Sequence, residues 1–351
     1  PAFIAEDYMT TKNNYLSRIE YELKVFQDFS GIVDKITKTW ENVDKELKMN
    51  QAIGRQITKT SLAKNLIQPS LLNDKSSFEK AKSIYNFVQQ NYTWDGDYRI
   101  FKDVSVKNLI KEKSGNVSEI NILLNSLLNH HGIKSQPVLL STRNNGFATK
   151  IFPVLFDFNY LIVQVTIDDK TYLLDATDDY LSFGELPFRC LNHSGRLLDF
   201  KNGSEWITIT PKSASSILHT VDLSITNEGS LTGVIKSRYS GYHSRSKKHD
   251  YFSDKESYLG DFENKFEEFE ISEHSVDCET KTEQNFNESF DITHSELSIT
   301  SDKFYLDPFF IKFKVSSELC LLTTILEFKS DEVFSCTIFS IFCSFFGNQS
   351  K

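Results

Sequence analysis

The strongest nucleophiles in the sequence are five cysteines, at positions 190, 278, 320, 336 and 343. A cysteine attacks a carbonyl group efficiently when a helix N-terminus lowers the pKa of its thiol, an imidazole accepts the proton, and a carboxylate or amide orients that imidazole. None of the five belongs to a CxxC pair, and Cys190 with His193 lacks the second ligand pair of a structural zinc site. The sequence therefore predicts no metal site and no bound cofactor.

A helix over residues 117–131 is the element best placed to hold a nucleophile in its first turn. Asn116 is expected to cap this helix, with Glu119 three residues later, and Gly132 is placed to end it. The apolar stripe of the helix consists of Ile120, Leu123, Leu124, Leu127 and Leu128. We therefore expect this helix to be the most buried one in the protein.

Strands that could carry the other two catalytic groups follow this helix. Apolar residues indicate strands over 136–142, 158–167 and 171–175, and residues 168–170 are typical of a hairpin turn between the last two. Helices followed by an antiparallel sheet indicate an α+β fold, because a parallel sheet would require strands that alternate with helices.

The N-terminal region shows one strand pattern and two helix patterns. Residues 15–26 alternate between apolar and charged side chains, which is typical of a half-buried strand that needs sheet partners. An apolar stripe over 30–48 predicts a linking helix. Ser76 and Glu79 form a capping box where a further helix is expected to begin.

Beyond Pro211 the pattern changes to short strands, expected over 218–224 and 230–237. An acidic amphipathic helix near 255–270 follows, and we expect it to pack on its own sheet rather than on a partner. The basic stretch over 238–248 is expected to be a solvated loop, because four positive charges in an acidic chain rarely make a nucleic-acid site.

The last part of the chain has an unusual composition. Residues 334–346 are rich in Phe, Cys and Ser and carry no charge, which is typical of aggregation-prone segments. The apolar residues of 318–346 follow neither a two-residue nor a 3.6-residue period throughout. We therefore expect residues 315–351 to pack poorly on the rest of the protein.

Composition narrows the classes of protein to which the chain can belong. The 351 residues contain 39 positive and 48 negative side chains, a formal net charge of −9. A chain this acidic is a poor candidate for nucleic-acid binding, which requires clustered Lys and Arg. The 29 Phe, 14 Tyr and 3 Trp exclude a wholly disordered chain. No apolar run reaches the roughly 18 residues that a membrane-spanning helix needs.

Seven sets of short motifs occur in a fixed order along the chain. They are Tyr8-Met-Thr-Thr with Asn14-Tyr-Leu-Ser-Arg-Ile, Lys113-Ser-Gly-Asn-Val-Ser-Glu-Ile-Asn before Leu123-Leu124, Gly132-Ile133, Pro137-Val-Leu-Leu-Ser-Thr, Asp157-Phe-Asn-Tyr160, Leu174-Asp-Ala-Thr177 and Leu186-Pro187. At these residues the sequence resembles bacterial transglutaminase-like proteins in which a papain-like core follows an N-terminal β-rich domain of unknown function. The resemblance covers residues 5 to 312 and implies a papain-like α+β core, a buried helix packed on an antiparallel sheet, with β-rich segments on either side.

The resemblance divides the chain into five segments. We expect a remnant of the N-terminal β domain at 1–28, a linking helix at 29–54, the transglutaminase-like core at 55–211, a β-rich domain at 212–312 and an atypical apolar tail at 313–351. Because the opening residues resemble only the end of the N-terminal β domain, we expect the sequence to be a fragment of a longer protein.

The positions that correspond to the family's catalytic triad are altered. The nucleophile's position, two residues after Gly115, is Val117, and the position of the base is Tyr160. The orienting acid is retained as Asp175. Val has no nucleophilic atom, and Tyr, with an ordinary pKa near 10, is a poor base near neutral pH. The resemblance therefore implies a degenerate triad without catalysis.

Two other residues could act as nucleophiles. Ser118 lies about 100° around the helix from Val117, has no histidine assigned to it, and is more simply a first-turn residue. Cys190 follows Leu186-Pro187 in an expected loop and is more simply a buried structural thiol. An acyl-transfer or peptidase-type enzyme that uses Ser118 or Cys190 is nevertheless an alternative, as is a carbohydrate-binding or adhesion protein that acts through its β domains.

We therefore expect a catalytically inactive transglutaminase-like domain that binds a polypeptide or cell-surface partner or serves as a structural module. A surviving cleft would be lined by Trp94, Asn116, Ser118 and Asn159, although buried aromatic packing is the simpler role for Trp94. The resemblance implies a periplasmic or cell-surface location, but the sequence lacks the basic and apolar regions of a signal peptide.

Overall fold

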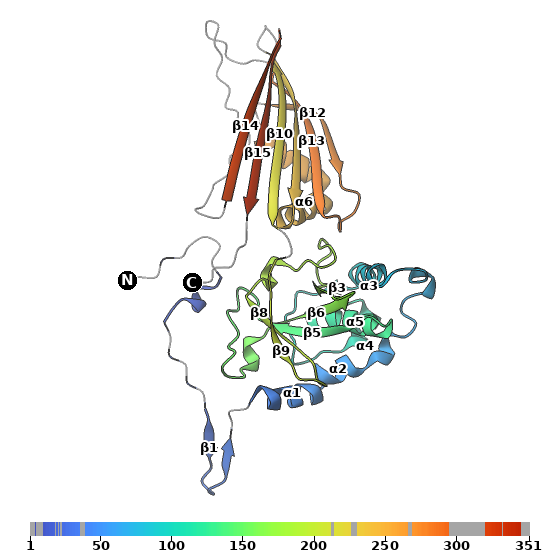
Figure 1. Cartoon of the computed structure of the whole chain (residues 1–351), viewed down its shortest axis with the longest axis vertical. Helices are drawn as coiled ribbons and strands as arrows, with labels where there is room; N and C mark the ends of the chain where they lie inside the picture. The colour runs from blue at the N-terminus through green and yellow to red at the C-terminus, as the bar shows by residue number, and fades with distance from the viewer. Residues whose placement is uncertain are drawn as a thin grey trace. The chain divides into compact units, whose positions relative to one another are not determined.

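The computed structural model describes residues 4, 10–17, 19, 21, 23–35, 39–211, 214–225, 230–265, 269–294, 320–331 and 333–344. The chain divides into two compact units (Figure 1). Unit 1 consists of Pro1–Asp179 and Phe183–Pro211, and unit 2 of Tyr180–Ser182 and Lys212–Lys351. Both units combine helices with an antiparallel sheet, so the predicted α+β class is confirmed. Within the described ranges, no helix has the length and apolarity to cross a membrane.

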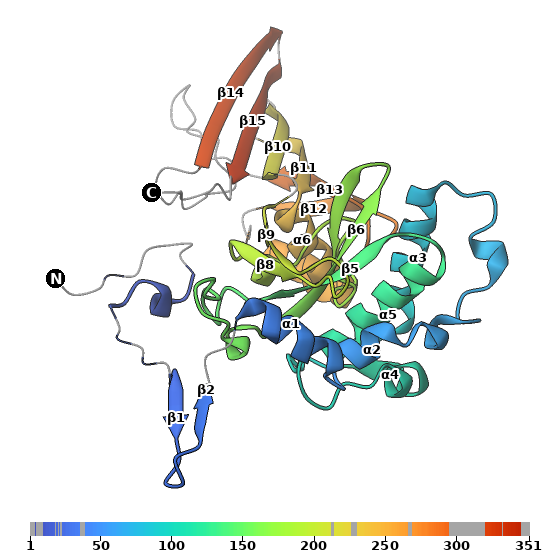
Figure 2. The same cartoon turned by 60° about the horizontal axis from the view of Figure 1, so that its bottom comes forward.

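The centre of unit 1 is helix α5 (Val117–His130), which lies against a five-stranded sheet (Figure 2). Every α5 residue from 117 to 128 is buried, as predicted for this helix. The sheet has the order β7-β6-β5-β8-β9 with all neighbours antiparallel. Its strands are β5 (Ser135–Leu140), β6 (Tyr160–Ile167), β7 (Lys170–Leu174), β8 (Ser194–Leu197) and β9 (Glu205–Thr208). Helix α5 packs on β5 and β6.

Three further helices of unit 1 pack against α5, and short strands and 3₁₀ helices lie between the longer elements. Helices α2 (Gly54–Thr58), α3 (Ser77–Asn91) and α4 (Val106–Glu112) contact α5. The short elements are β3 (Thr93–Trp94), β4 (Ser114–Gly115) and the 3₁₀ helices at Lys12–Asn14, Thr60–Ala63, Pro69–Leu71, Leu155–Asp157 and Phe188–Cys190. The capping box predicted at Ser76 and Glu79 is present at the start of α3.

Local sequence signals explain where the central elements begin and end. Asn116 and Glu119 form a reciprocal capping box at the start of α5. Gly132 follows the end of α5 with a φ of 78°, a conformation that favours glycine. Asp168 and Asp169 both have positive φ, as a two-residue hairpin turn of type I′ requires between β6 and β7.

A buried ion pair holds helix α1 (Trp40–Met49) on the sheet. Arg196 of β8 is 3% exposed, and its Nη2 donates to both carboxylate oxygens of Asp44 at 2.9 and 2.8 Å. The guanidinium also lies over the Trp40 ring, 4.3 Å from its centre. The ion pair therefore joins β8 to α1 alongside the buried α1 residues Val43 and Leu47 and the packing of Trp40 on Trp206.

The strand predicted over 15–26 does not form as expected. Ile19 and Tyr21 are 81% and 93% exposed, and the described residues up to Lys24 form no strand. Only β1 (Val25–Gln27) appears, and it pairs with β2 (Val33–Lys35). The prediction is therefore wrong for these residues, because a strand is stable only when it pairs with neighbouring strands and packs its apolar face.

The linking helix predicted over 30–48 begins only at Trp40. Residues 33–35 belong to β2, and residues 36–38 lie outside the described ranges. A turn explains the difference, because Asp28 Oδ1 accepts hydrogen bonds from the N–H groups of Ser30 and Ile32. Such a side-chain-capped turn competes with helix formation.

Unit 2 is a six-stranded antiparallel sheet with the order β12-β13-β11-β10-β15-β14. Its strands are β10 (Ser215–Ile225), β11 (Leu231–Ser240), β12 (Glu270–Asp277), β13 (Asn285–His294), β14 (Cys320–Asp331) and β15 (Val333–Ser344). Helices α6 (Tyr242–Ser253) and α7 (Lys255–Lys265) pack on it. The prediction that the acidic helix packs on its own sheet is confirmed, because Leu259 and Phe262 contact its core. Residues 266–268 lie outside the described ranges, and Glu270 already belongs to β12.

The basic stretch over 238–248 is not the solvated loop that we predicted. Arg238 lies on β11, and Lys248 lies on α6 and is 2% exposed. The Lys248 ammonium donates to the carbonyl oxygens of Tyr180 and Glu283 at 3.0 and 2.5 Å. These backbone acceptors replace water around the charge, which is how a lysine can be buried.

The prediction that the tail packs poorly is wrong for residues 320–331 and 333–344. They form the hairpin β14–β15, and β15 pairs with the whole of β10. The Phe, Ile and Thr residues of this segment favour strands, and pairing supplies the partners that such a strand needs.

Candidate functional site

The start of α5 is held by hydrogen bonds to the Glu119 carboxylate. The N–H of Asn116 donates to Glu119 Oε2 at 2.9 Å, and the N–H of Ser105 donates to Glu119 Oε1 at 2.6 Å. In return, Asn116 Oδ1 accepts the N–H of Glu119 at 3.0 Å. Asn116, which we expected in a cleft, is therefore a buried capping residue that fixes the first turn.

Val117 is the first residue of α5 and is fully buried. Its N–H donates to the carbonyl oxygen of Asp97 at 3.2 Å, and the indole Nε1 of Trp94 donates to the same oxygen at 3.0 Å. The short parallel pairing of Trp94 with Gly115 brings the indole next to the start of the helix. Two N–H groups therefore converge beside the side chain of Val117 on a single carbonyl oxygen.

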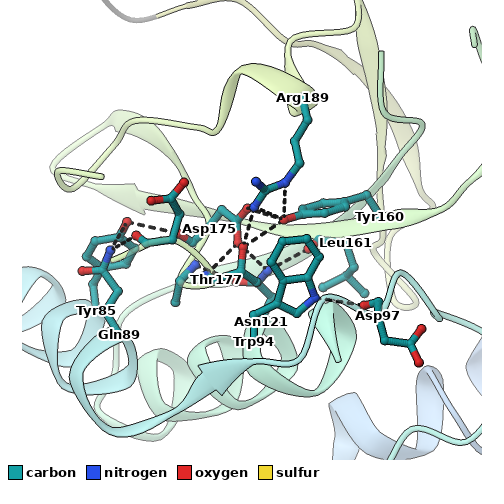
Figure 3. A network of polar contacts seen from close by, with 12 residues as sticks. Tyr85, Gln89, Trp94, Asp97, Asn121, Tyr160, Leu161, Asp175, Thr177 and Arg189 are labelled. Atoms are coloured by element: carbon teal, nitrogen blue, oxygen red, sulfur yellow. Dashed lines mark hydrogen bonds and ion pairs between the residues drawn. The ribbon is translucent and has the colours of Figure 1, made fainter. Parts of the chain in front are cut away.

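The Tyr160 hydroxyl lies at the centre of a polar network (Figure 3). It donates to Asp175 Oδ2 at 2.8 Å and lies 2.9 Å from Thr177 Oγ1. Its oxygen accepts hydrogen bonds from Arg189 Nη2 at 2.8 Å and Nε at 3.1 Å. Tyr160 begins β6 and Asp175 follows β7, so the antiparallel pairing of these strands brings the two residues together.

Asp175 is completely buried and has a partner for each carboxylate oxygen. Besides Tyr160, it accepts from Asn121 Nδ2 at 2.9 Å and from the N–H of Thr177 at 3.0 Å, both at Oδ1. Arg189 Nη2 lies 3.8 Å from Oδ2 and supplies the opposite charge. A buried carboxylate is tolerated only with such compensation.

Asn121 and Arg189 are network residues that our sequence analysis did not identify. Asn121 lies four residues after Val117, so helical spacing could have placed it on the same face of α5. Its amide also accepts the N–H of Ala176 and donates to the carbonyl of Leu161. Arg189 comes from a 3₁₀ helix at Phe188–Cys190, and no local pattern links that position to Tyr160.

Arg189 is also stacked on aromatic rings. Its guanidinium carbon lies 4.6 Å from the centre of the Trp94 ring and 5.3 Å from that of Tyr160. Trp94 is half-buried, and Tyr98 beside it is 40% exposed and 5.2 Å from it between ring centres. The Arg189 guanidinium is therefore held between the polar network and the partly exposed Trp94 ring.

Electrostatics fix the protonation states of the central groups. Burial, reinforced by the Asp175 carboxylate, raises the pKa of Tyr160 well above its ordinary value. Burial opposes the charge of Arg189, but Tyr160 and Asp175 outweigh it and raise the pKa of the guanidinium. Near neutral pH, Tyr160 is therefore a neutral phenol beside a permanent cation.

Ser118, Cys190 and Asn159, the other predicted site residues, do not belong to the hydrogen-bond network of Tyr160 and Asp175 as the structure describes it. Ser118 is fully buried, and its Oγ has no hydrogen-bond partner among the described residues. Cys190 is 1% exposed, and burial together with Asp175 raises the pKa of its thiol well above the ordinary value. Asn159 accepts the N–H of Thr142 at 2.9 Å and donates to Thr142 Oγ1 at 3.0 Å, so it fixes the end of β5.

Comparison with known proteins gives a match to the part of the chain that holds Val117, Asn121 and Tyr160. Residues 64–173 match the model of the transglutaminase-like superfamily. The chain contains a transglutaminase-like core. The matched residues of this core include Val117 and Tyr160, and they end two residues before Asp175. The remaining two thirds of the chain lie outside the match.

Other comparisons add little to this assignment. A solved structure of a "putative protease" from Parabacteroides distasonis is similar over 73% of this chain at 13% identity, with a TM-score of 0.34. The chain spans about half of that protein, 52% of its length. No curated protein matches the chain.

Proposed function

We propose that the transglutaminase-like core does not catalyse acyl transfer or peptide hydrolysis and instead serves as a binding or structural module. The observation that carries the proposal is the saturation of the Tyr160 hydroxyl oxygen. This oxygen donates to Asp175 and accepts two hydrogen bonds from Arg189. A general base needs a free lone pair and a pKa near the working pH, and Tyr160 offers neither.

The first turn of α5 supports the proposal independently. A nucleophile at position 117 would use the helix N-terminus to lower its pKa, but the valine side chain has no atom to activate. In acyl transfer, N–H groups near the nucleophile bind the negative oxygen of the transition state. Here the N–H groups of Val117 and Trp94 already donate to the Asp97 carbonyl, so they could bind a substrate oxygen only if that carbonyl moved.

The alternative of an enzyme that uses Ser118 or Cys190 has weaker support. Neither side chain hydrogen-bonds to an imidazole among the described residues, and a hydroxyl or thiol nucleophile needs such a base. The raised pKa of Cys190 also keeps its thiol protonated and unreactive near neutral pH.

A polypeptide or cell-surface partner is the occupant that the exposed side chains favour. Three large apolar residues of one loop of unit 1 face solvent, with Ile151 80%, Phe152 49% and Phe156 93% exposed. Exposed apolar side chains of this size are typical of contact surfaces between proteins. A periplasmic or surface location is part of the proposal and rests on the family resemblance alone.

The proposal is tested by restoring the two altered positions. In the double variant Val117→Cys with Tyr160→His, the introduced thiol would lie at the α5 N-terminus and the imidazole beside Asp175. We expect this thiol to react with iodoacetamide at pH 7 several-fold faster than the thiol of the matched variant Val117→Cys with Tyr160→Phe. Peptide mapping separates it from the five native cysteines. Equal rates would mean that these positions do not form a thiol–imidazole site.

A further inference from the structure

The open face of the unit 2 sheet carries a hollow that the transglutaminase-like core does not explain. Its volume is about 230 Å³, and strands β10 to β13 line it. Helix α7 packs near Ile235 and Phe290 on the opposite face. Lys236 and Ser289, which line the hollow, are the sequence neighbours of Ile235 and Phe290. Because successive strand residues point to opposite faces, Lys236 and Ser289 lie on the face away from α7.

Two cations stand side by side in this hollow. Lys236 and Arg238 are two residues apart on β11, so they share a face and their Cα atoms lie about 6.5–7 Å apart. Strand pairing places Ser289 next to Lys236 and Asn287 next to Arg238. A negatively charged group between the two cations could contact both, as well as these neutral hydrogen-bonding side chains.

In the part of the chain that the structure describes, neither Lys236 nor Arg238 forms an ion pair. The nearest acidic positions of the same face are Asp222 on β10 and Asp291 on β13, which lie opposite Val234, two residues before Lys236. The carboxylate of Glu288 is turned to the other face, where Tyr239 and Tyr258 donate to it. Asp277 lies on β12, separated from Arg238 by β13, and accepts from Asn287 Nδ2 at 3.5 Å.

Hydroxyl groups make up much of the remaining lining. Thr220, Ser275 and Ser289 contribute side-chain hydroxyls, and the structure gives none of them a side-chain hydrogen bond within the described residues. Leu218 adds an apolar wall at one edge. The hollow is smaller than the ~300–1,000 Å³ of sites for drug-sized ligands, so it suits one small ring or group.

We propose that this hollow binds one unit of an acidic saccharide, with a carboxylate or sulfate on Lys236 and Arg238. The Ser, Thr and Asn side chains would hydrogen-bond to the sugar hydroxyls, and the Asp277 carboxylate would accept from a hydroxyl on the far side. Two cations are too few for a nucleic acid, whose binding requires a longer basic track. The proposal concerns unit 2 alone and does not depend on whether the core is catalytic.

The experiment is calorimetric titration of the full chain with four probes. These are a galacturonic acid trimer for carboxylates, a sulfated heparin disaccharide for sulfates, neutral maltotriose and inorganic sulfate. We expect one or both acidic sugars to bind at low salt, more weakly at high salt, with maltotriose at least tenfold weaker. Failure of both acidic sugars, equal binding of maltotriose, or inorganic sulfate binding as tightly as the sugars would overturn the proposal.

Variants locate the site. Lys236→Gln and Arg238→Gln should each weaken binding of the acidic sugar at least tenfold, because each removes one of the two charges. Ser289→Glu, which places a carboxylate beside Lys236, should do the same without removing a cation. Lys255→Gln is the matched control. It also removes one positive charge, but Lys255 lies on α7, outside the hollow. An equal loss in the control would show that general charge, rather than this hollow, causes the binding.

Discussion

Tyr160 and Asp175 are joined by a hydrogen bond of 2.8 Å in which the phenol is the donor and the buried carboxylate the acceptor. An imidazole at position 160 would be oriented by the same carboxylate to accept a proton from a nucleophile. The phenol instead carries its own proton, and Arg189 occupies its oxygen from the other side. The contact therefore satisfies a buried charge.

Replacement of Tyr160 with phenylalanine should destabilise unit 1. Tyr160→Phe leaves Asp175 Oδ2 and the Arg189 donors without their shared partner, which we expect to lower the free energy of unfolding by about 1–3 kcal/mol. Urea unfolding followed by circular dichroism measures the change. Tyr98→Phe is the matched control, because Tyr98 is 40% exposed, and it should stay within about 0.5 kcal/mol. Equal small effects in both variants would argue against the network.

Asp199 should make the stability of unit 1 depend on pH in acid. The backbone N–H of Asn202 and other donors, including Gln136 Nε2, lower the pKa of Asp199 to about 2. A lowered folded-state pKa stabilises the protein above the ordinary value of 3.8, and this contribution is lost as the pH falls through about 2.

We therefore expect Asp199→Asn to be less stable than the wild type at pH 5, with the difference shrinking at pH 2.5. Urea midpoints at the two pH values measure it. A difference of the same size at both pH values would mean that the Asp199 carboxylate does not carry the effect.

The hairpin β14–β15 should contribute to the stability of unit 2. Truncation after Lys314 would leave one edge of β10 unpaired along its whole length. We expect the melting temperature of unit 2 to fall by more than about 5 °C. This is more than the shift that a loss of about 1 kcal/mol in the free energy of unfolding would produce. Phe339→Pro should act in the same direction, because proline removes an N–H inside a strand that has neighbours on both sides. Unchanged melting in both proteins would show that β15 is not part of the sheet.

The elements that the sequence predicted well are those with local signals. The capping residues Asn116 and Glu119, the apolar stripe of α5 and the Asp168-Asp169 turn all lie within a few positions of the elements they define. Tyr160 and Asp175 could be paired only through the family resemblance, although the short turn between β6 and β7 makes their proximity a local consequence.

The elements that the sequence did not predict depend on distant partners. The alternation over 15–26 did not produce the predicted strand, because no sheet partners pair with it in the described residues, and β15 pairs with β10, which lies more than one hundred residues earlier. Arg189 reaches Tyr160 from a separate loop, and Lys248 is buried only because the carbonyls of Tyr180 and Glu283 surround it. Single-sequence patterns carry no information about such contacts.

Turnover by the wild-type chain decides whether the transglutaminase-like core is catalytic. We would incubate the purified protein with a glutamine-containing peptide, with and without a primary amine, and follow amine incorporation, deamidation and peptide cleavage by mass spectrometry. We expect no product above the rate of a protein-free control, because Val117 offers no nucleophile and Tyr160 no base. Product formation that Ser118→Ala or Cys190→Ala abolishes, in a variant that still folds, would contradict this expectation.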